Sequence, residues 1–425
     1  MAIEPETTLS DGFDYWILRI CRDSAAVVLF IIGPILQVAV TRWMPAAILL
    51  ALVFLLVGHA ITGFRHLNFR QSVRSFRTDP VRLLVLSFAA FVVWYAIGIF
   101  RSPIPLEALF DVAALLALIP IALILARECS RTIIAPMSIM VMSGSLIGAT
   151  LVLLDLLGLT SLYALRDTNS ELYDLNRNTI GLVFLAIPIA VFSKPTALHK
   201  ILAFGFLIVL AAVLWATQSQ TAQLAAVFAG AVWGILTVAP RLRTWLIASA
   251  AAFTLVFPLL LPLVGAAVTN SSSSFLKDGH ALHRAAIWQG YADEIADSPI
   301  FGTGAKADRH LAMKGALAET LSDAGFDTRT THPHNFVLEI WVNFGLIGAI
   351  LFAAVLLSLA KTVAGLGQQE GMAATCLLVA AYVSALVGAS WLQGWYLAAL
   401  VIAIVAFLGW PRREDKDLST DSNDF

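Results

Sequence analysis

Residues 331–336 of this chain are Thr-His-Pro-His-Asn-Phe, and they lead into FVLEIWVNFGLIGAILFAAVLLSLA, the apolar stretch 336–360. A stretch of this length crosses a bilayer as a helix, because a spanning helix needs about 20 predominantly apolar residues. Its start carries the imidazoles of His332 and His334 and the carboxamide of Asn335, which are costly to bury in a membrane. The stretch therefore predicts a membrane helix with a functional site at its N-terminal end.

The remainder of the chain is similarly apolar. Of its 425 residues, 59% are hydrophobic and 13% are charged, and the mean hydropathy is +0.84. Long apolar runs separated by short basic loops are what a multi-pass helical membrane protein requires, so a soluble globular protein is excluded. We predict an all-α polytopic membrane fold with about twelve transmembrane helices, at 24–40, 46–64, 82–100, 106–126, 132–158, 178–193, 200–216, 221–239, 244–269, 336–360, 372–389 and 392–410.

The basic residues predict how these helices are oriented. Lys and Arg favour the cytoplasmic side of short loops, and one side of the predicted bundle collects most of them, whereas the short loops of the other side hold Arg42, Arg101, Arg166 and Arg177. This bias places both termini in the cytoplasm and the one long loop outside. The predicted parts are a cytoplasmic N-terminus at 1–23, nine helices at 24–269, an outer loop at 270–335, three helices at 336–410 and a cytoplasmic tail at 411–425.

The outer loop contains a predicted helix and a turn. Residues 282–295 have helical spacing, with Arg284, Trp288 and Tyr291 along one side, and residues 299–304, Pro-Ile-Phe-Gly-Thr-Gly, are typical of a turn. Trp288 and Tyr291 suit the headgroup level of a membrane. The helix is interpreted either as a lid that lies on the membrane or as the cover of an active site.

Two blocks of this region resemble a known family. The pattern His334-Asn335, nine residues, Gly345, two residues, Gly348 resembles the signature of the bacterial O-antigen ligase and polymerase family, and the two glycines are expected to be close-packing positions inside the helix. A second block of that family, in the same large loop, resembles Arg284, Trp288 and residues 299–304. The resemblance implies a GT-C-like glycosyltransferase of the bacterial inner membrane that acts on undecaprenyl-diphosphate-linked glycans through a periplasmic loop, with no metal and no other cofactor.

The chemistry that the resemblance implies has a candidate for each role. Transfer from a diphosphate-linked lipid releases an anionic leaving group, so Arg284 is the predicted catalytic cation; a guanidinium presents a planar fork of donors to phosphate oxygens. His334 is predicted to activate the acceptor, since an imidazole with an unperturbed pKa of about 6.5 can take the proton of a sugar hydroxyl. The alternatives are an ordinary exposed loop arginine and a helix-capping or interface histidine.

Four neighbouring residues are predicted to bind substrate or to support His334. Asn335 either caps the helix or binds glycan. Glu339, about one helical turn further on, either orients His334 or Asn335 through a hydrogen bond or is a solvated acid at the helix end. His332 competes with His334 for the catalytic role, but the family pattern requires an asparagine directly after the histidine. Trp288 is the fourth member of this set.

One position departs from the family pattern. The resemblance leads us to expect a Ser-Arg pair at the start of the eighth span, but residues 217–221 are Thr-Gln-Ser-Gln-Thr. Gln220 can donate hydrogen bonds to a diphosphate, yet it cannot balance its charge. Arg177, at the outer start of the sixth span, is the predicted substitute; the alternative is an arginine that extends to the membrane interface.

No metal site is predicted. The acids of the outer loop have no convincing ligand spacing with a histidine, so they are expected to form a solvated surface: Asp293, Glu294, Asp297, Asp308, Glu319, Asp323 and Asp327. The three cysteines indicate neither a disulfide framework nor a thiolate site. Asp111 and Asp155 are intramembrane acids without a predicted role.

The predicted function is that of an O-antigen ligase, which transfers a glycan from undecaprenyl diphosphate to the sugar core of lipid A. The alternative is an O-antigen or exopolysaccharide polymerase, whose acceptor is a lipid-linked repeat. A transporter is less favoured, because the usual transporter has two matched halves with its longest loop at the midpoint. The expected partners are the lipid-linked glycan, the glycan acceptor and membrane lipids, with no nucleic acid. The oligomeric state is left open.

Overall fold

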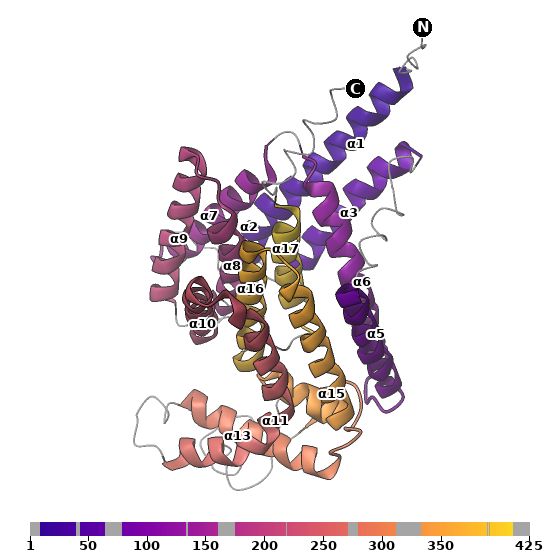
Figure 1. The fold of residues 1–425 in the computed structure, drawn as a ribbon, viewed down its shortest axis with the longest axis vertical. Coiled ribbons are helices and arrows are strands. Elements are labelled where there is room, and N and C mark those ends of the chain that lie inside the picture. Colours follow the sequence, from indigo (N-terminus) through magenta and orange to yellow (C-terminus); the bar gives the residue numbers. More distant parts are fainter. Residues whose placement is uncertain are drawn as a thin grey trace. The chain divides into compact units, whose positions relative to one another are not determined.

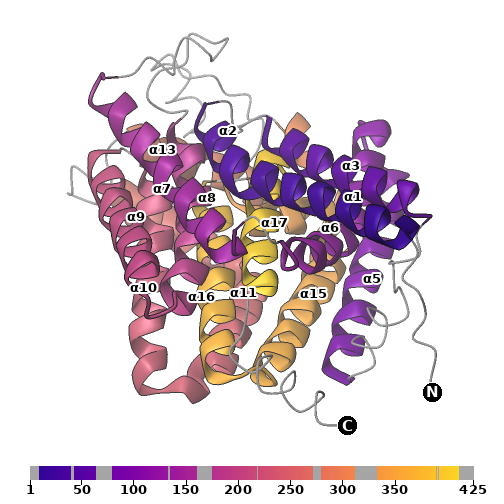
Figure 2. The ribbon, with the colours of Figure 1, turned by 90° about the horizontal axis from the view of Figure 1, so that it is seen from above.

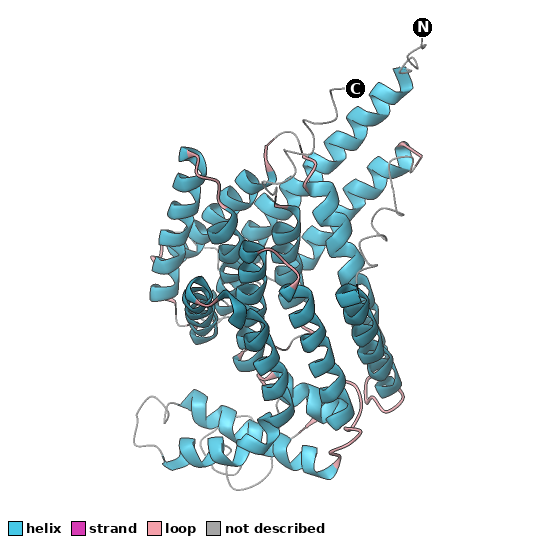
Figure 3. Ribbon diagram, in the orientation of Figure 1, coloured by secondary structure: helices cyan, strands magenta, loops and turns pink. Residues whose placement is uncertain are grey.

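A computed structural model confirms the predicted all-α polytopic fold. It describes residues 9–39, 43–63, 79–132, 135–159, 175–217, 219–270, 279–311, 333–388, 390 and 392–410, and all regular structure in these residues is helical, as Figure 3 shows. Ten of the described helices are long and apolar enough to cross a membrane, and two shorter apolar helices are Arg177–Phe192 and Gly394–Gly409. Each predicted span coincides with one of these helices.

The main elements are labelled in Figure 1. In chain order they are α1 (Leu9–Val27), the π-helical turn η1 (Val28–Ile32), α2 (Gly33–Ala39), α3 (Met44–Ile61), α5 (Asp79–Ile99), α6 (Pro105–Cys129), α7 (Met137–Leu156), α8 (Leu175–Phe192), α9 (Ala197–Ala216), α10 (Gln220–Val238), α11 (Arg243–Asn270), α13 (Gly279–Asp297), the 3-10 turn η7 (Ala307–His310), α15 (Phe336–Ala364), α16 (Gln368–Val387) and α17 (Gly394–Gly409). The first helix begins at Leu9, ahead of the expected span 24–40.

These elements form two compact units. The first consists of Met1–Arg74, Leu118–Ala226 and Gly394–Phe425, and the second of Ser75–Ala117 and Val227–Gln393, so α6 and α10 contribute to both. In the first unit α7 packs against α9, and α8 packs against α17. Gly144 of α7 lets that helix approach the carbonyl group of Phe30 in the π-helical turn, where a Cβ would overlap it.

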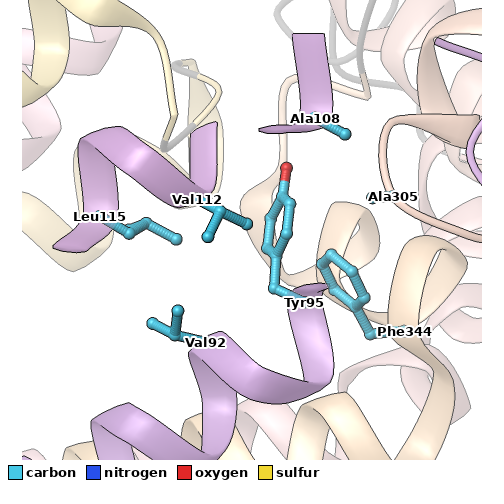
Figure 4. Close-up of a cluster of buried hydrophobic side chains, with 7 residues drawn as sticks. All are labelled: Val92, Tyr95, Ala108, Val112, Leu115, Ala305 and Phe344. Atoms are coloured by element: carbon cyan, nitrogen blue, oxygen red, sulfur yellow. The ribbon is translucent and has the colours of Figure 1, made fainter. Parts of the chain in front are cut away.

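The second unit is built around α15. This helix packs against α11, α16 and α5, and α11, α15 and α16 run side by side in Figures 1 and 2. Helix α13 contacts both α11 and α15 and lies across their ends. An apolar cluster between α5, α6 and α15 contains Tyr95 and Phe344, whose ring centroids are 4.7 Å apart (Figure 4).

Helix α15 is broken at Gly345. This residue has φ 63° and ψ −162°, a backbone conformation that is essentially restricted to glycine. The break leaves backbone groups on both sides of Gly345 without partners inside the helix. The turn at residues 299–304 supplies these partners: Thr303 N donates to Val342 O (2.7 Å), Gly304 N to Asn343 O (3.0 Å), Leu346 N to Pro299 O (2.8 Å) and Ile347 N to Ile300 O (3.3 Å).

Gly345 and Gly348 were both predicted to be close-packing positions inside the helix. Gly345 is a close-packing position, as predicted, because a Cβ there would overlap the backbone of Ile300. It was also expected to lie inside a regular helix, but it breaks the helix and creates the gap into which the turn fits. Gly348 is a close-packing position, because a Cβ there would overlap the Phe344 side chain. The turn is also attached to the end of α5, since the Arg101 guanidinium donates to the carbonyl groups of Phe301 and Gly302, each at 3.0 Å.

Candidate functional site

The N-terminal end of α15 is fixed by Asn335. Its Oδ1 accepts hydrogen bonds from Val337 N (3.0 Å) and Leu338 N (3.2 Å), so this residue caps the helix, which was one of its two predicted roles. The preceding residue, His334, has φ 52°. A left-handed conformation costs a residue with a side chain about 1–3 kcal/mol, and it persists only where surrounding contacts hold it.

One of these contacts is made by the His334 ring. Its Nδ1 lies 3.3 Å from the carbonyl oxygen of Gly388, in the connection between α16 and α17. A carbonyl oxygen can only accept a hydrogen bond, so Nδ1 carries the hydrogen in this arrangement. In a neutral imidazole Nε2 is then the nitrogen that can accept a proton. The contact therefore gives His334 the tautomer in which Nε2 can act as a base.

A second contact comes from Trp288 of α13. The indole Nε1 donates to the carbonyl oxygen of Pro333 at 2.9 Å, and the indole packs edge-on against Phe257 of α11 with ring centroids 5.9 Å apart. Trp288 thereby ties α13 to the residue directly before His334. Because residues four apart lie on the same helix face, Arg284 is one turn from this contact and on the same side of α13.

Arg284 is a half-buried cation. Burial lowers the pKa of its guanidinium below the ordinary value. In the part of the chain that the structure describes, Arg284 forms no hydrogen bond or ion pair. A partly desolvated guanidinium without a carboxylate partner favours an anionic ligand, because charge pairing offsets the cost of its desolvation.

Glu339 lies one turn after the cap, on the inner side of α15. Its side chain is buried, with 3% of the residue exposed, so it is not a solvated acid at the helix end. Its Oε2 accepts a hydrogen bond from Ser390 Oγ at 3.0 Å. Since Ser390 belongs to the same connection as Gly388, one segment contacts both the His334 ring and the Glu339 carboxylate.

Two predicted residues belong to the first unit. Arg177 lies in the first turn of α8 and is partly buried. Its neighbour Asn178 is held in place, because Gln37 Nε2 donates to Asn178 O (2.8 Å) and Asn178 Nδ2 donates to Val38 O (2.9 Å). Gln220 is the exposed first residue of α10. The structure brings the other described candidates together in the second unit, and His332 lies outside the described residues.

Asp308 is buried, and the prediction for this residue is wrong. This residue was expected on a solvated surface, but it is 4% exposed. Its Oδ1 accepts a hydrogen bond from Asn343 Nδ2 (2.7 Å), and its backbone N donates to Asn343 Oδ1 (3.1 Å). Burial raises the pKa of Asp308 to about 6, although the hydrogen bond from Asn343 acts in the opposite direction. Asp293 and Asp297, in contrast, are exposed as predicted.

Lys306 connects the same segment to α6, and through Asp111 to Tyr95 of α5. Its Nζ lies 3.1 Å from Asp111 Oδ2 and 3.5 Å from Glu107 Oε2, and Tyr95 OH donates to Asp111 Oδ2 at 2.9 Å. Figure 4 shows the Tyr95 hydroxyl at the edge of the apolar cluster. Asp111 thus has a structural role that the sequence did not reveal. The available signals were the charged residues at 306–309 and polar Asn343 inside an apolar run.

Within the described residues, no group of three or more His, Cys, Asp and Glu side chains could hold a metal ion.

Comparison with known proteins relates one segment of the chain, which includes the site, to a family. Residues 204–353, which include α13, the 299–304 turn and the start of α15, match the family described as O-antigen ligase. A protein of Rickettsia bellii, provisionally named polysaccharide ligase, is 22% identical over 151 residues, which are 35% of this chain and 37% of that protein. A similarly named protein of Rickettsia conorii is 24% identical over 126 residues, 29% of this chain and 31% of that protein.

The pattern from His334 to Gly348 predicted this family, and the match over residues 204–353, which include the pattern, confirms the prediction for that segment. The chain spans about a third of the length of the relatives it matches. What those relatives do as whole proteins is therefore carried over only as a proposal.

Proposed function

We propose that the protein transfers a glycan from undecaprenyl diphosphate to a sugar hydroxyl of lipid A-core. The match of segment 204–353 to the O-antigen ligase family supports this proposal. The reaction would take place on the periplasmic face of the bacterial inner membrane. The observation that carries the proposal is the hydrogen bond from Trp288 Nε1 to Pro333 O. It joins the helix that bears Arg284, a cation without a hydrogen bond or ion pair among the described residues, to the segment that bears His334, whose basic nitrogen is Nε2.

The reaction follows from these two groups. The acceptor hydroxyl oxygen forms a bond to the anomeric carbon of the donor sugar while its proton passes to His334 Nε2. The bond between that carbon and the diphosphate oxygen breaks, and its electron pair stays with the diphosphate. Arg284 stabilises this developing negative charge, which a fixed cation in a partly desolvated site does better than water. The proton leaves His334 when the product departs.

The donor diphosphate needs more than one binding group, and we assign Arg177 and Gln220 to it. Gln220 is exposed at the start of α10, where the backbone N–H groups of a helix favour anions. Arg177 supplies the charge that a glutamine lacks. The anchored position of Asn178 supports this assignment, because it fixes the start of α8 from which Arg177 extends.

A polymerase is the second candidate, because it would use the same donor and the same His-Asn pair. We favour the ligase because the motif from His334 to Gly348 is complete and the outer loop at 270–335 is modest in length. A transporter is the third candidate. Its usual arrangement of two matched halves places the longest loop at the midpoint, whereas here this loop follows the ninth predicted span.

A deletion strain complemented with variants tests the proposal. Wild-type protein and Asp297→Asn, an exposed control on the same helix as Arg284, should restore long glycan on lipid A. His334→Ala and Arg284→Ala should be present at normal levels in the membrane but should leave polymerised glycan on its lipid carrier. Single-repeat products in the deletion strain would identify a polymerase instead. Normal surface glycan with His334→Ala would refute the catalytic role and favour a transporter.

A further inference from the structure

Two buried polar atoms at the start of α15 have no hydrogen-bond partner in the part of the chain that the structure describes. Asn335 is fully buried and Glu339 is 3% exposed, yet Asn335 Nδ2 and Glu339 Oε1 have no hydrogen-bond partner among the described residues. Buried side-chain nitrogen and oxygen atoms nearly always have a partner in protein or water. A pair of unsatisfied atoms on one helix therefore indicates that something else occupies the space beside them.

Both side chains are held in place by their other polar atom. Asn335 Oδ1 accepts from Val337 N and Leu338 N, which fixes the amide plane and directs Nδ2 away from the helix start. Glu339 Oε2 accepts from Ser390 Oγ, which fixes the carboxylate. The unsatisfied atoms are thus held in place by the hydrogen bonds of the other polar atom of each side chain.

The two atoms fit one kind of ligand group. Glu339 N donates to the carbonyl oxygen of the capping residue Asn335 at 3.2 Å, so the two residues lie one helical turn apart, and we place a single small group against both side chains. Nδ2 is a donor and a carboxylate oxygen is an acceptor, and a hydroxyl group can accept from the first and donate to the second. An ammonium group could not accept from Asn335 Nδ2, and an ether or carbonyl oxygen could not donate to Glu339 Oε1.

We propose that Asn335 Nδ2 and Glu339 Oε1 form a receptor for one hydroxyl group of the glycan substrate. This inference rests on the proposed glycosyl transfer and adds a binding contact to it. The receptor begins at the residue next to His334, and the connection that contacts Glu339 through Ser390 also contacts the His334 ring through Gly388. A hydroxyl held there fixes the orientation of a sugar ring relative to the basic Nε2. The ring belongs to either the acceptor or the donor.

Two conservative variants separate the receptor from the helix cap. Asn335→Asp keeps an oxygen that can cap α15, since aspartate is as good a cap as asparagine, but it replaces the donor with an acceptor. Glu339→Gln keeps an oxygen for Ser390 but replaces the acceptor with a donor. In the double variant donor and acceptor have exchanged places, and a hydroxyl can rotate to satisfy both. Thr196→Asp, a cap exchange at the start of α9 where Thr196 accepts from His199 N, is the matched control.

The assay uses the full chain purified in lipid nanodiscs, with the lipid-linked glycan and the glycolipid acceptor extracted from the source strain. Asn335→Asp should raise KM roughly 10- to 100-fold for the substrate that carries the bound hydroxyl, because one buried hydrogen bond is replaced by repulsion. The double variant should recover most of this loss, and Thr196→Asp should match wild type. Titration of acceptor at fixed donor, and of donor at fixed acceptor, identifies which sugar is bound.

Other outcomes overturn the receptor. Unchanged KM values for both substrates in Asn335→Asp would refute it, as would a double variant no better than the worse single one. A loss of thermal stability that parallels the loss of activity would show that the two atoms serve the fold, for example through an internal water. If His334→Ala is inactive while both single variants behave as wild type, the receptor is refuted and the proposed transfer stands. If His334→Ala is fully active, both the receptor and the proposed transfer are refuted.

Discussion

The sharpest prediction concerns the break in α15 at Gly345. We expect that Gly345→Ala destabilises the second unit and lowers transfer, whereas most glycine-to-alanine changes in helices are stabilising. The backbone of Gly345, at φ 63° and ψ −162°, is nearly forbidden to alanine. A Cβ at this position would also overlap the carbonyl group of Ile300. The protein can relieve this strain only by giving up hydrogen bonds to the 299–304 turn.

The size of the effect follows from these two routes. Keeping the conformation costs about 1–3 kcal/mol of backbone strain in addition to the overlap. If the backbone leaves this conformation, the four backbone hydrogen bonds between α15 and the turn at 299–304 are lost, each worth about 0.5–1.5 kcal/mol. Either route gives a loss of about 3 kcal/mol. For a unit of about 200 residues, this corresponds to a fall in apparent Tm of roughly 6 to 12 °C.

Thermal unfolding in detergent and transfer in nanodiscs measure the two consequences. Gly234→Ala is the matched control, because a Cβ at Gly234, in α10, meets no atom within 4 Å. This control should be as stable as wild type or slightly more stable. If Gly345→Ala unfolds at the wild-type temperature and retains full transfer, the break in α15 does not depend on a glycine at position 345.

Three further predictions address single residues. Because burial raises the pKa of Asp308 to about 6 from an ordinary 3.8, the folded state binds the extra proton between these values. The contribution of Asp308 to stability should therefore be greatest below pH 4 and fall by up to about 3 kcal/mol as the pH rises through 6; Asp308→Asn should remove this part of the pH dependence in thermal unfolding from pH 4 to 7. Arg177→Ala should abolish transfer at normal protein levels, and Gln220→Arg in the same chain should restore part of it in the nanodisc assay. Trp288→Phe, which loses the hydrogen bond to Pro333, should lower kcat roughly 5- to 10-fold with little change in KM, since about 1 kcal/mol of positioning is removed; an unchanged kcat would separate this bond from catalysis.

The helical framework could be predicted from the sequence because membrane helices have a strong and local signal. Apolar runs of sufficient length identify the helices without knowledge of their neighbours. The beginning of α15 was predicted for the same reason, since the polar residues up to Asn335 end where the apolar run starts. The first helix was placed too late, because Leu9–Val27 includes several charged residues that a hydropathy pattern excludes.

The contacts that organise the site depend on residues distant in sequence, and no local pattern reports them. Gly345 has the same neighbours whether it packs closely or breaks the helix, and only the inserted turn at 299–304 decides between these states. Asp308 was predicted to be solvated because it lies in a polar loop. Its burial depends on Asn343, 35 positions further along the chain. Long-range pairings of this kind require the fold before they can be recognised.

The structure explains why nine residues separate Asn335 from Gly345. The first part of α15 is held at one end by the Asn335 cap and at the other by the break at Gly345, so its length is fixed at nine residues. A helix rises 1.5 Å and turns 100° per residue, so one inserted residue would rotate the cap and His334 by about 100° relative to the turn at 299–304. Residues 299–304 follow α13 almost directly, and α13 holds Pro333 through Trp288. The turn and the indole therefore fix the two ends of the same rigid segment, and the position of His334 relative to Trp288 depends on the number of residues between Asn335 and Gly345.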